Sequence, residues 1–169
     1  TNDISDQGAR SLGEALKINQ ALASLNFHGN NISDEGANAL AEALKTNQTL
    51  TALELGLNYR MSDQGAKSLA AAMKVNQALK SLNLGYNNIS DKGAKSLAAV
   101  LQINQTLAYL SLYKCCVADE GARALAEAMK VNQTLTSLIL YDNNISDDLA
   151  RGAIDAALER NLGQSRQAD

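Results

Sequence analysis

The chain has 169 residues and a net charge of −3, and 46% of its residues are hydrophobic although it contains one Phe, no Trp and no Pro. This length fits a single domain, whose core must consist of Leu and Ala rather than aromatic residues. The acidic balance argues against a nucleic-acid partner, because a phosphate-binding surface needs clustered Lys and Arg. Apolar runs fall short of the about 20 residues that span a bilayer, so we expect no membrane insertion.

A unit of 28 residues recurs along the chain. The Asp of an (I/M/V)-(S/A)-D triplet marks each copy, and the steps between copies are 28 residues except for one of 29. A fixed period of this length indicates a solenoid, in which each unit packs against its neighbours. The marked positions are Asp6, Asp34, Asp63, Asp91, Asp119 and Asp147.

Each unit is predicted to contain one short strand and one helix. In residues 79–106, Leu82 and Leu84 lie two apart and therefore point to the same face of a strand. Ala94, Leu97 and Leu101 follow at helical spacing and form an apolar stripe. In chain order, the pattern predicts helices at 6–18, 34–46, 63–75, 91–103, 119–131 and 147–160, and strands at 23–27, 51–55, 80–84, 108–112 and 136–140.

Stacked units of this kind predict a curved α/β solenoid. Neighbouring strands lie about 4.8 Å apart, whereas packed helices need about 8–10 Å. That mismatch bends the array, so that short parallel strands line the concave face and helices cover the convex face. We therefore predict a right-handed α/β horseshoe with a parallel sheet of five strands.

A column of Asn residues is expected where the strands end. A side-chain amide can donate to one backbone carbonyl and accept from another amide, which satisfies groups that a tight bend leaves unpaired. One position departs from Asn and carries Cys. The column, which we expect to be structural, comprises Asn2, Asn30, Asn58, Asn87, Cys115 and Asn143.

The two ends of the chain differ from the middle. Residues 1–6 correspond to the middle of a unit, so we expect an N-terminally truncated array with about five and a half units over residues 1–160. The segment 147–160 is more polar than the other helices, as a terminal cap should be. Residues 161–169 are predicted to form a polar, disordered tail.

The pattern LxxLxLxxNxI…GAxxLAxAL…NxxL resembles the ribonuclease-inhibitor-like class of leucine-rich repeats. It is most similar to the C-terminal repeat region of NOD-like receptors, and related arrays occur in bacterial effector proteins. The resemblance covers residues 1 to about 160. It implies a horseshoe that binds a protein or another ligand on its concave face, within a larger sensor or effector, and it implies no cofactor. The sequence contains no P-loop motif GxxxxGK(S/T) of the kind that a NOD-like receptor carries elsewhere.

The outward-facing strand positions vary from unit to unit, and aromatic residues gather in the last three strands. Tyr combines apolar area with a hydroxyl, which favours it at binding hot spots. The alternative is that these Tyr residues reflect β propensity alone. The predicted partner-binding patch comprises Tyr86, Tyr109, Ser111, Tyr113, Ile139 and Tyr141, with Lys114 and Asp142 at its edge.

A second candidate surface is the one-residue insertion near Tyr59 and Arg60. It is expected to bulge the loop after Asn58 and to present both side chains outward. A neutral insertion is the equal alternative, because surface loops accept extra residues at low cost.

Few features of the sequence indicate an enzyme or a metal site. His28 is the only histidine, and no nucleophile is placed beside it by the sequence. The six Asp residues that mark the units are an alternative candidate for a row of calcium sites. We expect each of them to act at a helix N-terminus instead. Cys115 lacks a positioned base, and the adjacent pair Cys115 and Cys116 indicates reduced thiols rather than a disulfide framework. We therefore predict a protein that is not an enzyme and binds no metal.

Two other functions remain open. Some ribonuclease-inhibitor-like arrays activate GTPases, although the acidic tail of the nuclear-transport version is missing here. A scaffold that self-associates weakly through its open N-terminal edge is the other alternative to a monomer. The expected location is the cytoplasm, or a host cytoplasm for an effector.

Overall fold

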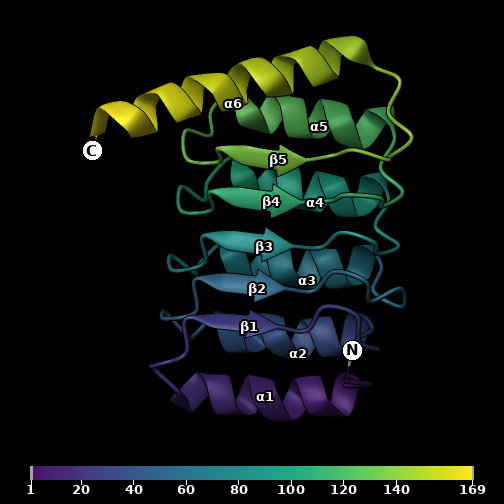
Figure 1. Cartoon of the computed structure of the whole chain (residues 1–169), viewed down its shortest axis with the longest axis vertical. Helices are drawn as coiled ribbons and strands as arrows, with labels where there is room; N and C mark the ends of the chain where they lie inside the picture. Colours follow the sequence, from purple (N-terminus) through teal and green to yellow (C-terminus); the bar gives the residue numbers. More distant parts are fainter. Residues whose placement is uncertain (1, 169) are drawn as a thin grey trace.

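The computed structural model describes residues 2–168 and shows a regular stack of strand–helix units (Figure 1). The strands are stacked on one side of the array and helices α2 to α5 lie on the other. The elements in chain order are α1 (Asp6–Ile18), β1 (Ser24–Asn26), α2 (Asp34–Leu44), β2 (Ala52–Glu54), α3 (Asp63–Met73), β3 (Ser81–Asn83), α4 (Asp91–Leu101), β4 (Tyr109–Ser111), α5 (Asp119–Met129), β5 (Ser137–Ile139) and α6 (Asp148–Ala168).

The five strands form one parallel sheet in the order β1-β2-β3-β4-β5. The central Leu of each strand pairs with the central Leu of the next, so that Leu53, Leu82 and Leu110 form a buried row. The predicted α/β horseshoe of five strands and six helices is therefore confirmed. Its core runs between the sheet and the helices and consists mainly of Leu and Ala.

The strands have three residues, whereas the sequence predicted five. At the start of β2, the N–H groups of Thr51 and Ala52 both donate to the Ala23 carbonyl, at 2.8 and 3.1 Å. Two donors on one acceptor interrupt the even spacing of a parallel ladder, so the regular strand begins only afterwards. Helices α2 to α5 likewise end two residues earlier than predicted, because their last residues form a turn.

In the first five units, the marker Asp acts on the next unit rather than on its own helix, whereas Asp147 accepts from the Ala150 N–H of its own helix. The Ser90 side chain caps α4 by accepting from the Lys92 N–H. Asp63, one unit earlier, accepts from the N–H groups of Ser90 and Gly93 at 2.7 and 2.9 Å. A Cβ on Gly93 would lie 2.8 Å from this carboxylate oxygen, so the glycine is needed for the close approach. These bonds join successive units.

Helix α6 corrects the expectation of a disordered tail, since it continues to Ala168. Asn161 is fully buried within it, and its side-chain amide donates to the carbonyls of Asn132 and Leu135 at 3.2 and 2.8 Å. The Arg160 guanidinium reaches the Met129 carbonyl at 2.9 Å. These side chains donate to backbone carbonyls of the preceding unit. Because the bonds hold residues 160 and 161 against that unit, the helix continues past residue 160. Residue 169 lies outside the described residues.

The N-terminal edge of the array is open among the described residues. Leu12 and Leu22 are 38% and 39% exposed, whereas their counterparts Leu40 and Leu50 in the next unit are buried. The hydrophobic surface that joins units elsewhere is thus accessible on α1. In residues 2–168, no helix combines the length and the apolar character needed to cross a membrane.

Candidate functional site

Two Asn columns hold the backbone on which the candidate site stands. Within the first, the Asn58 side chain donates to the Phe27 and Leu55 carbonyls at 3.0 and 2.9 Å and accepts from the Ile32 N–H at 2.9 Å. Asn87 and Asn143 make equivalent donations to their neighbours. At the N-terminal end the bonds are fewer, since the exposed Asn2 contributes only its backbone N–H, which donates to Asn30.

Cys115 occupies the same column without an amide. Its sulfur lies 3.4 Å from the Leu84 carbonyl and 3.8 Å from the Tyr113 carbonyl. Burial raises the pKa of this thiol to about 11, which keeps it protonated and able to donate. Cys116 is exposed, and both cysteines are free.

A second Asn column, which the sequence analysis did not predict, lies where each helix turns into the next strand. The Asn104 side chain donates to the Met73 and Asn76 carbonyls at 2.9 and 3.2 Å and accepts from the Leu107 N–H at 3.0 Å. The signal was present, because a buried polar residue that recurs in register must be hydrogen-bonded. The buried members are Asn47, Asn76, Asn104, Asn132 and Asn161.

From Asn30 onward, the residue before each member of the first column has a left-handed backbone. Gly29 adopts this conformation with φ of 66°, but Leu57, Tyr86, Lys114 and Asp142 adopt it with φ between 50° and 59°. Large side chains rarely adopt such angles, and each costs about 1–3 kcal/mol. Three of the four non-glycine cases are residues of the predicted binding patch.

Those three residues form a connected group with Tyr113 on the strand face. The Tyr86 and Tyr113 rings pack edge to face, with centroids 5.0 Å apart and an interplanar angle of 78°. The Lys114 ammonium lies 5.3 Å from the centre of the Tyr86 ring, within the range of a cation–π contact. The Tyr113 hydroxyl donates to Asp142 at 2.8 Å. We call Tyr86, Tyr113, Lys114 and Asp142 the tyrosine cluster.

The tyrosine cluster fixes the positions of its own side chains. The Asp142 carboxylate that accepts the hydrogen bond raises the pKa of the Tyr113 hydroxyl far above its ordinary value, and the contact with Tyr86 adds to this effect. The hydroxyl is therefore a neutral donor at physiological pH. A partner would meet preorganised aromatic rings flanked by one cation and one anion.

A hollow of about 230 Å³ lies beside the cluster on the strand face, and we call it the inner hollow. Gly85 belongs to its lining, and a Cβ on Gly56 would lie 2.8 Å from the His28 ring. His28 and Asn83 belong to its wall but were absent from the predicted patch. The signal for this space was in the sequence, because the position that carries His28 in one unit and Tyr113 in another carries Gly56 and Gly85 in the two units between them. The lining residues are His28, Asn83, Gly85, Tyr86, Tyr109, Ser111, Tyr113 and Ile139.

Tyr141 lies apart from the inner hollow. Its side chain is 74% exposed and lines a separate hollow of about 210 Å³ between β5 and α6. We call this space the end hollow. It is lined by Leu138, Leu140, Tyr141, Asp142, Arg151, Ile154 and Asp155. The structure therefore brings together Tyr86, Tyr109, Ser111, Tyr113 and Ile139, with Asp142 as the link to the second hollow.

The insertion at Tyr59 and Arg60 points outward. Tyr59 is 69% exposed and Arg60 is also exposed. The positive charge of Arg60 is one of several influences that keep the pKa of Asp6 below its ordinary value. No contact with the tyrosine cluster is found among the described residues, so this loop is a separate candidate.

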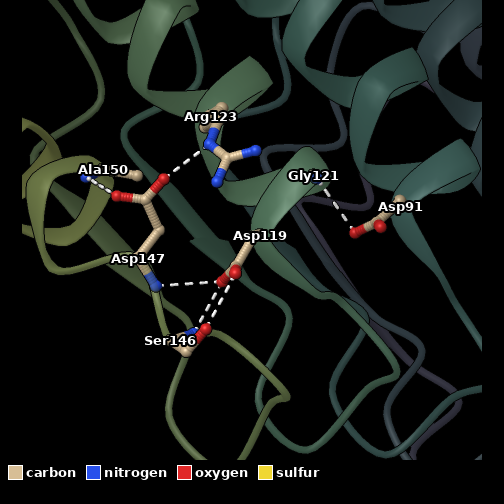
Figure 2. A network of polar contacts seen from close by, with 7 residues as sticks. All are labelled: Asp91, Asp119, Gly121, Arg123, Ser146, Asp147 and Ala150. Carbon is tan, nitrogen blue, oxygen red and sulfur yellow. Dashed lines mark hydrogen bonds and ion pairs between the residues drawn. The ribbon is translucent and has the colours of Figure 1, made fainter.

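The carboxylates of the Asp column are occupied by hydrogen bonds, as Figure 2 shows for the last units. Asp119 accepts from the Ser146 and Asp147 N–H groups at 2.6 and 2.9 Å, and Asp147 accepts from Ala150 and from Arg123 at 3.0 and 2.5 Å. These donors lower the pKa of both carboxyl groups. Within residues 2–168, no group of three or more His, Cys, Asp or Glu side chains is arranged to hold a metal ion.

His28 is part of the wall of the inner hollow. In the described part of the chain, its imidazole makes no hydrogen bond, and the residues that share its hollow include no cysteine. Ser111, the serine of that hollow, is 4% exposed and accepts from the Tyr113 N–H at 3.4 Å.

Comparison with known proteins gives matches along most of the chain. A family model described as leucine-rich repeat matches residues 19–41, 46–70, 75–98, 104–126 and 131–148. Actin-binding site 2 of leiomodin-1 is a solved structure with 26% identity and a TM-score of 0.83, covering 94% of this chain and 91% of that one. The C-terminal domain of Caenorhabditis elegans tropomodulin has 19% identity and a TM-score of 0.82, covering 95% and 96%. No curated protein sequence matches the chain.

Proposed function

The chain belongs to the leucine-rich repeat family, and from this premise we propose that it is a protein-binding module whose partner lies on the strand face. The observation that carries the proposal is the left-handed backbone at Tyr86, Lys114 and Asp142. Gly29 fills the equivalent position without strain, whereas the larger side chains hold it at a conformational cost. Tyr86 and Asp142 contact Tyr113, and Lys114 contacts the Tyr86 ring.

The partner that fits this surface presents an apolar side chain beside polar groups of both charges. The inner hollow takes the apolar group, and Lys114 and Asp142 select charged or polar neighbours. Tyr141, Tyr59 and Arg60 are proposed as outlying contacts. No catalytic role is assigned to any residue, and we propose that the module works without a cofactor or metal.

Quantitative capture from a cell extract with immobilised protein tests this proposal. The double variant Tyr86→Ala and Tyr113→Ala should lose the partners that the wild type retains, while its circular dichroism stays unchanged. The control variant Val131→Ala alters an exposed residue outside the predicted binding patch. Equal capture by all three proteins would contradict binding through the tyrosine cluster.

Actin is a specific candidate partner, because the similar structure with 26% identity is an actin-binding site of leiomodin-1. Co-sedimentation with filamentous actin and a titration with monomeric actin test this candidate. The candidate would be supported if the wild type binds actin and the double variant Tyr86→Ala and Tyr113→Ala binds it more weakly. The absence of binding in both assays would retire actin and leave the strand-face proposal intact.

The narrower affiliations proposed from the sequence differ from these relatives. Membership of a NOD-like receptor or a bacterial effector, and a cytoplasmic location consistent with two free cysteines, stay as predictions. GTPase activation is tested by a hydrolysis assay with a panel of small GTPases. Self-association through the exposed Leu12 and Leu22 is tested by light scattering over a concentration series.

A further inference from the structure

The outer edge of β5 has unpaired backbone groups beside an apolar hollow. In the interior of the sheet, the Leu112 N–H donates to the Ile139 carbonyl and the Lys114 N–H donates to the Tyr141 carbonyl, at 2.9 and 3.0 Å. The equivalent groups one unit later are the N–H groups of Leu140 and Asp142. Neither has a hydrogen-bond partner among residues 2–168.

The helix that follows β5 leaves space beside this edge. Figure 1 shows α6 at the end of the stack, beyond β5. Between the two elements lies the end hollow of about 210 Å³, whose apolar wall includes Leu138, Leu140 and Ile154. Leu138 and Leu140 correspond to Leu110 and Leu112, which the next unit covers completely.

We propose that the β5 edge and the end hollow bind an extended segment of a partner protein, which adds to the sheet as a sixth parallel strand. This mode of recognition takes affinity from backbone hydrogen bonds and specificity from alternate side chains. The site is separate from the inner hollow and does not depend on the function proposed for the tyrosine cluster.

The register of the sheet defines the bound segment. Because Ser111 pairs with Ile139, the segment residue that pairs with Ile139 accepts from the Leu140 N–H, and the residue two further on accepts from the Asp142 N–H. In the interior, two consecutive N–H groups donate to the Ala108 carbonyl. The Thr136 carbonyl is the equivalent acceptor for the bound segment.

Side chains of the segment follow from the same register. The residues on either side of the one paired with Ile139 point toward the core, where Leu138, Leu140 and Ile154 form the wall. They are therefore aliphatic and two positions apart. Asp142 and Asp155 stand at the rim, while Arg151 donates to the Ile145 carbonyl, so a flanking Lys or Arg is preferred over an acid.

Residues 78–88 of this chain supply a suitable probe. A synthetic peptide of this sequence has Leu82 and Leu84 at the required spacing, one Lys and no acid. Within the protein the Lys80 and Ser81 N–H groups both donate to the Thr51 carbonyl, so the free peptide can present them to Thr136. A control peptide carries N-methyl groups at these two positions and lacks those donors.

Amide hydrogen exchange with residue resolution tests the proposal. In the free protein, the Leu140 and Asp142 amides should exchange faster than those of Leu112 and Lys114. Saturation with the peptide should slow exchange at Leu140 and Asp142. The N-methylated peptide should bind more weakly, by a factor of about ten or greater. The proposal would be overturned if the Leu140 and Asp142 amides exchanged slowly without peptide or if the peptide left their exchange unchanged. Protection of β1 in place of these amides would also overturn it.

Protein variants separate this site from the strand face. Leu140→Lys should abolish peptide binding, whereas Val131→Lys and the Tyr86→Ala and Tyr113→Ala variant should bind as the wild type does. If Leu140→Lys is unstable by circular dichroism, the N-methylated peptide decides. Protection that rises with protein concentration alone would overturn the partner assignment, since a second copy would then occupy the edge.

Discussion

At the scale of single residues, the structure separates side chains that hold the backbone from side chains that are free to bind. Asn58 and Asn104 use every oxygen and nitrogen of their amides on backbone groups of the same or the preceding unit. Tyr86, Lys114 and Asp142 instead sit at strained backbone angles. Tyr86 and Asp142 contact Tyr113, and Lys114 contacts Tyr86. The second set is therefore where function is most directly tested.

Cys115 and Cys116 provide a prediction at this scale. Burial raises the pKa of the Cys115 thiol to about 11, whereas Cys116 is exposed. Because the thiolate is the reactive form, native protein at pH 8 should consume one equivalent of a thiol reagent quickly and the second only on unfolding. Cys116→Ser should abolish the fast phase and Cys115→Ser should leave it. Two fast equivalents in the wild type would contradict the buried position of Cys115.

Asn104 provides a second prediction. Replacing it with Ala removes both donors and the acceptor of a buried amide, and it leaves the Met73 and Asn76 carbonyls without that donor. The variant should lose about 1–3 kcal/mol of unfolding free energy in urea titrations. Gln105→Ala, an exposed neighbour, is the matched control and should change stability little. Equal stability of both variants would show that the column is dispensable.

At the scale of elements, each helix start depends on the preceding unit. Asp6 illustrates the balance, because burial acts to raise its pKa but hydrogen bonds from Ser33 and Gly36 outweigh burial and lower it. Asp119 and Asp147 have lowered pKa values because backbone donors face them. A helix in this array is thus joined electrostatically to its predecessor as well as packed against it.

This linkage predicts a pH dependence of stability. A carboxyl group whose pKa is lower in the folded state binds protons more readily when unfolded, so its contribution is complete above the unfolded pKa of about 3.9. It is lost as pH falls through the lower folded pKa. The unfolding free energy should therefore stay level from pH 7 to about 5 and fall below about 4. Asp119→Asn should lower stability at pH 7 and reduce the slope below pH 4, and an unchanged slope would count against this role.

The elements were largely predictable from sequence because the signal is repeated. Leu at alternate positions and apolar residues at helical spacing recur in register, so an error in one unit is corrected by the others. Strand length was overestimated because the shared Ala23 acceptor leaves no trace in the pattern. The end of α6 was missed because Asn161 lies beyond the consensus, although it continues the second Asn column at a step of 29 residues.

The candidate site was predictable only in part. Variation at the strand-face positions identified Tyr86, Tyr109 and Tyr113, since Tyr109 lies in β4 and the other two lie shortly after the neighbouring strands β3 and β4. Tyr141 was grouped with them because register gives the order of strands but not the direction in which a side chain leaves the last one. His28 was missed because two glycines open the space between distant units, and that effect depends on three-dimensional shape.

At the scale of the whole molecule, the array is a chain of similar interfaces with two unlike ends. The α1 end exposes hydrophobic residues that are buried in every later unit, whereas α6 covers much of the other end. In such arrays stability is close to a sum over units and their interfaces, so a change at one end affects the neighbouring unit first. Local unfolding of the array should therefore begin at its ends.

Truncation of α6 tests this description. Removal of residues 160–169 deletes Arg160 and Asn161 and leaves the Asn132 carbonyl without the donors that α6 supplies. The midpoint of thermal unfolding should fall by several degrees, with exchange protection lost first in β5 and α5. Removal of residues 164–169 spares these bonds and should have little effect. Equal midpoints for both truncations would show that α6 does not act as a cap.

The most direct test of the central claim is the dissociation constant of a partner captured on the strand face. Isothermal titration should compare the wild type with Tyr113→Phe, Tyr113→Ala and the control Val131→Ala. We predict that Tyr113→Ala weakens binding by about 2 kcal/mol, that Tyr113→Phe falls between it and the wild type because only the bond to Asp142 is lost, and that Val131→Ala has no effect. Equal dissociation constants for the wild type and Tyr113→Ala would contradict the claim that the tyrosine cluster binds the partner.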